Sequence, residues 1–148
     1  MTYQEWDFVA DTYIPLLGVF FTVSMINVAR NKDWMSLRQS ITGVLLSTGF
    51  IYGLMWLDNI MNIWPRLGLD YSTHTALALV FVVYFSRQST TKRLLATSSM
   101  LLYCLLMLYQ QYHSIMDMLT TSIITLPILY LIQLRTSKTK NISGCNIK

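Results

Sequence analysis

The chain contains two histidines, His74 and His113, and Asp117 follows the second of them by four residues. On a helix, side chains four residues apart share a face, so this carboxylate could accept a hydrogen bond from one ring nitrogen and leave the other free to attack. One imidazole prepared as a nucleophile and a second serving as proton donor are the groups needed for phosphoryl transfer through a phosphohistidine. These three side chains are therefore the candidate catalytic residues.

His74 belongs to a polar stretch, residues 70–75, that comes after a turn containing proline and glycine and before an apolar run. This pattern predicts the start of a helix, with Ser72 or Asp70 as its N-cap. The free N–H groups of a helix start, together with a hydroxyl, form an anion site. A phosphate bound there would contact Ser72, Thr73 and His74.

The composition is that of a membrane protein. Of the 148 residues 53% are hydrophobic and 12% are charged, whereas a soluble domain carries about 25% charged residues. Five apolar runs are close in length to the roughly 30 Å core of a bilayer at about 1.5 Å per helical residue. We therefore predict an all-α integral membrane protein, residues 1–134, built as a compact bundle of about five transmembrane helices. The expected spans lie near residues 12–29, 39–62, 71–86, 94–113 and 114–134, followed by a basic tail at 135–148.

The charge pattern predicts how this bundle lies in the membrane. The net charge is +4, and ten of the eleven Lys and Arg residues fall on one side of a five-span arrangement, with Arg66 alone on the other. Because Lys and Arg gather in cytoplasmic loops, we expect the N-terminus outside and the C-terminus in the cytoplasm. Topology thus explains the basic residues, and we expect no nucleic-acid partner. Both histidines and Asp117 are expected on the outer side, at one membrane depth.

Arg66 is the one guanidinium expected beside the histidines. It could clamp a phosphate through paired hydrogen bonds, or it could simply extend toward lipid head groups. Asp58 and Asp70 are expected on the same side as possible supporting residues, and Asp58 could either hold Arg66 or face the pocket. The sequence does not decide between these alternatives.

Each motif also has a plainer interpretation. Asp117 could cap the fifth helix, with His113 as a chance neighbour at the interface. The residues around His74 could be a capping motif alone. A metal site made by His74, His113 and Asp117 is a further alternative, because an imidazole held by a carboxylate is a common metal ligand. The catalytic interpretation is preferred since ionisable groups gathered at one membrane depth mark functional sites.

Ser72-Thr73-His74-Thr75 at a helix start, followed by His113-x-x-x-Asp117 at the next helix junction on the same side, resembles the type 2 phosphatidic acid phosphatase superfamily. The resemblance covers roughly residues 58–125. It implies a helical bundle with an extracytoplasmic site that removes or moves phosphate groups on lipids, with no metal and no cofactor. It further implies that His113 is the nucleophile, Asp117 its orienting partner and His74 the general acid, with Ser72 and the amide of Thr73 binding phosphate.

The chain departs from the family pattern in its basic residues. The lysine of the family's first motif would be Asn59, Trp64-Pro65-Arg66 is at best a remnant of the rest, and Met107 stands where an arginine is expected. Thr73 replaces the usual glycine, and the usual bundle has six spans. The sphingomyelin synthase branch similarly uses two histidines and an aspartate without those basic motifs, on singly charged phosphodiesters.

From this resemblance we expect a membrane lipid phosphatase that acts on a phospholipid or polyprenyl phosphate at the extracytoplasmic face of the plasma (inner) membrane. The alternatives are a lipid head-group phosphotransferase or phosphodiesterase using the same residues, and a non-catalytic lipid-binding homologue. The sequence leaves the lipid and the oligomeric state open.

Overall fold

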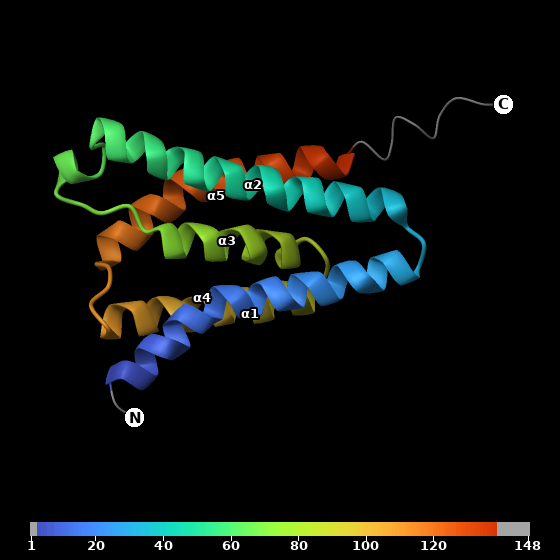
Figure 1. Cartoon of the computed structure of the whole chain (residues 1–148), viewed down its shortest axis with the longest axis horizontal. Coiled ribbons are helices and arrows are strands. Elements are labelled where there is room, and N and C mark those ends of the chain that lie inside the picture. The colour runs from blue at the N-terminus through green and yellow to red at the C-terminus, as the bar shows by residue number, and fades with distance from the viewer. Residues whose placement is uncertain (1–2, 139–148) are drawn as a thin grey trace.

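The structure of the chain is a computed structural model that describes the backbone of residues 3–138 and the side chains of residues 8–137. Within this range it contains five α-helices, one short 3-10 helix and no strand. The helices run alternately in opposite directions and lie side by side as a bundle (Figure 1). Their bounds are α1 Tyr3–Arg30, α2 Trp34–Met61, η1 Pro65–Leu67, α3 Thr73–Ser86, α4 Thr90–Tyr109 and α5 Ile115–Lys138.

Four of these helices are long and apolar enough to cross a membrane, namely most of α1 and α5 and the whole of α2 and α4. Their outer surfaces carry exposed apolar side chains such as Phe20, Leu45, Leu102 and Ile123. Several buried side chains, in contrast, are polar. A bundle that is apolar outside and partly polar inside matches a lipid surrounding, so the chain has the character of a helical membrane protein.

The third predicted span is a different kind of element. α3 has 14 residues and reaches only about 21 Å, which is shorter than a bilayer core of about 30 Å. It packs against all four other helices and lies in the middle of the bundle (Figure 1). Buried residues cover most of its circumference, as expected of a helix that is apolar all round. Of the five predicted transmembrane helices, four are long enough to span a membrane, and the third, which is also the shortest apolar run of the sequence, is a short central helix.

The fourth and fifth helices also differ from their expected bounds. α4 was expected to continue to residue 113 but ends at Tyr109, and α5 begins at Ile115. His113 therefore lies in the connection between the two helices. α5 then continues into the first residues of the predicted tail, and the rest of that tail, residues 139–148, lies outside the described residues.

The two ends of the bundle carry different side chains. At one end, which we call the histidine end, lie His74 and His113 with the α2–α3 and α4–α5 connections. At the other, which we call the basic end, lie the α1–α2 and α3–α4 connections and the end of α5 (Figure 1). Apart from Arg66, the Lys and Arg residues between positions 3 and 138 lie at or near the basic end.

Side chains fix where three of the helices begin. Asp33 accepts a hydrogen bond from the Ser36 amide at the start of α2, and Ser89 accepts one from the Lys92 amide at the start of α4. Of the two predicted N-cap candidates, Ser72 and Asp70, it is Ser72 that caps α3, and it is fully buried. Capping satisfies N–H groups that have no partner within the helix, so each cap sets the register of its helix.

We predict that Ser72→Ala destabilises the protein by about 2 kcal/mol, because the lost cap leaves buried polar groups unsatisfied. The matched control is Ser89→Ala, at an exposed cap that water can replace, which should cost about 0.5–1 kcal/mol. Thermal unfolding in detergent measures both. A larger loss in Ser89→Ala than in Ser72→Ala would contradict this account of α3.

Candidate functional site

The connection between α2 and α3 is held by the first two turns of α5. Three side chains on one face of α5, Asp117, Thr120 and Thr121, each accept a hydrogen bond from this connection, and we call them the α5 clamp. The donors are the Trp64 indole Nε1 (3.2 Å to Thr120 Oγ1), the Asp70 amide (2.8 Å to Asp117 Oδ1) and the Ser72 amide (3.1 Å to Thr121 Oγ1). The clamp fixes the start of α3, and with it the position of His74.

Asp117 also fixes the connection that carries His113. Its Oδ2 accepts a hydrogen bond from the Ser114 amide at 2.8 Å, while the Asp117 amide donates to Ser114 Oγ at 3.2 Å. This reciprocal pair is a capping box at the start of α5. Both carboxylate oxygens are thus bonded to backbone amides, of Asp70 and of Ser114. The capping role that the sequence left as an alternative is what the structure displays.

His113 and Asp117 do not share a helical face, because His113 precedes the first residue of α5. The helical basis of the predicted pair is therefore wrong. The carboxylate beside the His113 ring is instead that of Asp70, whose Oδ2 lies 3.7 Å from His113 Nδ1. The Asp70 side chain is 73% exposed and the His113 side chain 11%. Asp70, which was predicted only as support, becomes the carboxylate nearest to this imidazole nitrogen.

The two imidazoles lie close together. Their ring centroids are 6.5 Å apart and their planes are inclined by 51°. His74 is exposed on the first turn of α3, while His113 is partly buried in the α4–α5 connection. Residues far apart in the sequence are thereby brought to one place at the histidine end, which is open to the surroundings through His74 and Asp70.

Burial shifts the ionisation of His113. Desolvation lowers the pKa of its imidazole, and nearby His74 lowers it further, while the carboxylates of Asp70 and Asp117 act in the opposite direction; the net shift is downward. His113 Nδ1 is buried and has no hydrogen-bond partner among the described residues. The ring is therefore held in the neutral form to lower pH than an exposed histidine would be.

The remaining predicted residues have separate positions. Ser72 Oγ is buried, contacts Thr75 Oγ1 at 2.8 Å and forms the cap of α3, so it faces the protein interior. The amide of Thr73 donates to the Tyr71 carbonyl at 3.1 Å. Arg66 is exposed in η1.

Asp58 is buried and does not serve as a free acid. Its Oδ1 accepts a hydrogen bond from the Trp64 amide at 2.9 Å, so it stabilises the turn after α2. Thr120 and Thr121 lie outside the motifs that the sequence presents. The sequence could have indicated them through their spacing, because they follow Asp117 by three and four residues and positions so spaced share a helix face.

No group of three His, Cys, Asp or Glu side chains in the described part of the chain is arranged to hold a metal ion. The alternative of a site made by His74, His113 and Asp117 is not supported, since both Asp117 oxygens already accept backbone hydrogen bonds.

Comparison of the chain with protein families, curated proteins and solved structures gives no match. The likeness to the phosphatidic acid phosphatase superfamily thus remains a resemblance of short motifs.

We predict that Asp117→Ala lowers the free energy of unfolding by about 2–4 kcal/mol, because it leaves two amides without their acceptor. The matched control is Asp70→Ala, which removes an exposed carboxylate but keeps the amide that bonds to Asp117, and should change stability by less than about 0.5 kcal/mol. Denaturation of the purified proteins measures the difference. Equal losses in the two variants would mean that the α5 clamp does not hold the site.

Proposed function

We propose that this chain is an integral membrane enzyme that removes a phosphate from a lipid phosphate, either a phospholipid or a polyprenyl phosphate, through a phosphohistidine intermediate. The observation that carries the proposal is the pair of imidazoles with centroids 6.5 Å apart at an exposed end of the bundle. Of the two rings, one is partly buried with a lowered pKa and the other is exposed. Two imidazoles in different surroundings suit a nucleophile and a proton donor.

In the first step His113 attacks phosphorus with Nε2, since Nδ1 is buried on the side of Asp70. The new N–P bond forms as the bond between phosphorus and the lipid oxygen breaks. His74, in its protonated form, gives a proton to the leaving lipid alcohol. In the second step neutral His74 takes a proton from water, the hydroxide oxygen bonds to phosphorus, the N–P bond breaks and inorganic phosphate leaves.

The other residues position these groups. Asp70 orients His113 through the contact of its Oδ2 with Nδ1, which is 3.7 Å long. Catalytic contacts of this kind are often long without substrate and shorten when substrate binds. Asp117 acts through the backbone of both connections, and its charge raises the His113 pKa. Arg66 and the amides at the start of α3, including that of His74, are proposed to bind the phosphate oxygens. Thr73 lies at the same helix start, and Ser72 supports this site as its buried cap.

The histidine end is proposed to face the extracytoplasmic side of the plasma (inner) membrane. The support is the clustering of the described Lys and Arg residues at the opposite end, where the positive-inside rule expects the cytoplasm. The N-terminus would then lie outside and the C-terminus inside.

A second candidate is a lipid head-group phosphotransferase or phosphodiesterase that uses the same residues. It is favoured by the fact that Arg66 is the one Lys or Arg of residues 3–138 at the histidine end. A phosphomonoester dianion requires several donors, whereas a phosphodiester carries a single charge. Identification of the released product, free phosphate or phosphorylated head group, separates the two.

We predict that His113→Gln abolishes phosphate release from lipid phosphates and that His74→Gln lowers it by about 10²–10⁴-fold. Tyr112→Phe, an exposed neighbour of His113 in the same connection, is the control and should retain activity. The wild-type pH profile should be a bell, with its acidic limb below the ordinary histidine range because burial lowers the His113 pKa. Full activity in His113→Gln, or a flat profile between about pH 5 and 8, would exclude the mechanism.

We further predict that Asp70→Asn lowers kcat about tenfold and moves the acidic limb to lower pH. The direction follows from charge, because the Asp70 carboxylate raises the pKa of His113 and its loss lets that pKa fall further. Asp11→Asn, which removes an exposed carboxylate from α1, should leave the limb in place. An acidic limb that stays unchanged in Asp70→Asn would assign Asp70 no positioning role.

A further inference from the structure

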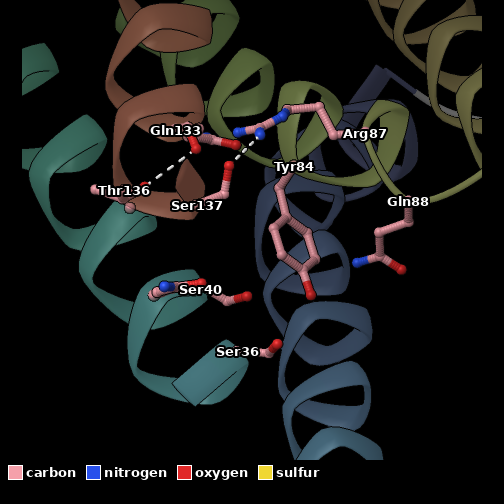
Figure 2. A pocket seen from close by; sticks show the side chains of 10 residues that line it. Ser36, Ser40, Tyr84, Arg87, Gln88, Gln133, Thr136 and Ser137 are labelled. Atoms are coloured by element: carbon pink, nitrogen blue, oxygen red, sulfur yellow. Dashed lines mark hydrogen bonds between the residues drawn. The ribbon is translucent and has the colours of Figure 1, made fainter. Parts of the chain in front are cut away.

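The basic end contains a cavity of about 180 Å³ that the proposed catalysis does not use. Its walls come from α2, from α5 and from the end of α3, which stops short of the neighbouring helices (Figures 1 and 2). α3 has 14 residues whereas α2 has 28 and α5 has 24. The short central helix therefore leaves a recess between its longer neighbours.

The residues that line this recess are mostly polar in type, and one of them is positively charged. They include Arg87 with its guanidinium, Ser40, Tyr84 and Ser137 with their hydroxyls, and Gln39 and Gln133 with their amides, and no carboxylate is among the described residues that line it. The volume of the recess equals that of about six water molecules at liquid density, which is enough for a phosphate group.

Arg87 reaches into the recess from the end of α3, as Figure 2 shows. Its Nη2 donates to Ser137 Oγ at 2.6 Å, and its Cζ lies 5.9 Å from the centre of the Tyr130 ring. Neither partner is an anion. The guanidinium is thus partly desolvated beside neutral groups, and desolvation lowers its pKa. Such a cation is complemented by an anion that supplies several acceptor oxygens.

A second donor in the wall lacks a partner. Gln39 Nε2 is buried and makes no hydrogen bond to any described residue. Gly43, also in the wall, allows α2 and α5 to approach closely, since a Cβ at this position would come within 2.8 Å of Thr136 Oγ1. A buried donor without an acceptor is rare in native proteins and indicates a missing partner.

We propose that this recess binds the phosphate group of an anionic phospholipid, with the Arg87 guanidinium as its principal ligand and the Gln39 amide as a further donor. A phospholipid is favoured over a soluble phosphate ester because a larger apolar groove of about 640 Å³ adjoins the recess, and Gln88 lines both. Leu17, Phe20 and Leu95 line that groove between α1 and α4, and it fits an acyl chain. The site is separate from the histidine end and does not rest on the phosphatase proposal.

The test is titration of the purified full-length protein in detergent with three ligands: short-chain phosphatidylglycerol, glycerol 3-phosphate and diacylglycerol. Binding of each ligand is measured by the shift that it causes in the unfolding temperature. Phosphatidylglycerol should stabilise the wild type, and diacylglycerol should not. Arg87→Gln should weaken phosphatidylglycerol binding roughly tenfold or more. Arg93→Gln removes the same charge at the same end, from an exposed side chain outside the recess, and should bind as the wild type does.

Ser40→Leu keeps every charge but fills the recess, so it should weaken phosphatidylglycerol binding as Arg87→Gln does. If Arg87→Gln fails to fold, Ser40→Leu alone tests whether the lipid binds in the recess. Binding of glycerol 3-phosphate as tight as that of the lipid would keep the phosphate site and identify a soluble ester as its source. Equal weakening in Arg87→Gln and Arg93→Gln, unchanged binding in Ser40→Leu, or equal binding of diacylglycerol would each overturn the proposal.

Discussion

The hydrogen bonds between the first two turns of α5 and the α2–α3 connection are the interaction on which the histidine end depends. Asp117 is at their centre, because its two oxygens accept from the amides of Asp70 and Ser114. One amide precedes α3 and therefore His74; the other directly follows His113. A single buried carboxylate thus sets the distance between two imidazoles that lie 39 positions apart in the chain. In the family that the motifs resemble, this aspartate would act on the histidine directly, whereas here each of its oxygens accepts a hydrogen bond from a backbone amide.

Buried polar side chains continue along α5 beyond Asp117. Thr121, Thr125 and Gln133 follow it in this helix, and all of them are buried. Thr125 donates to the Thr121 carbonyl, and Gln133 donates to the Val80 carbonyl of α3. Satisfied polar groups between apolar helices give α5 and α3 a defined register, which dispersion contacts alone specify weakly. α5 therefore links the candidate catalytic site at one end to the polar recess at the other.

Hydropathy was sufficient to predict a helical membrane bundle but could not predict the place of α3. A helix buried among other helices and a helix facing lipid are both apolar, so composition does not distinguish them. The end of α4 was missed because residues 110–114 contain neither charge, proline nor glycine to mark a stop. The chain turns there all the same, with Gln111 at a φ of +58°.

The sequence could predict which residues form the candidate site, but it could not predict most of the contacts between them. A cap at Ser72 or Asp70 and the proximity of the histidines follow from the sequence pattern and the alternating helices. The role of Asp117 was ambiguous, because it belongs both to His113-x-x-x-Asp117 and to the capping pattern Ser114-x-x-Asp117. Local sequence cannot choose between these, since the choice depends on where α5 begins. The approach of Asp70 to His113 depends on tertiary packing of two connections and has no signal in either motif.

Amide hydrogen exchange measured residue by residue tests the central claim most directly. In the wild type the amides of Asp70 and Ser114 should exchange slowly, although both residues have exposed side chains in connections. In Asp117→Ala both should exchange at rates typical of an open loop, while amides in the middle of α2 keep their protection. Fast exchange of these two amides in the wild type, or unchanged protection in the variant, would contradict the account.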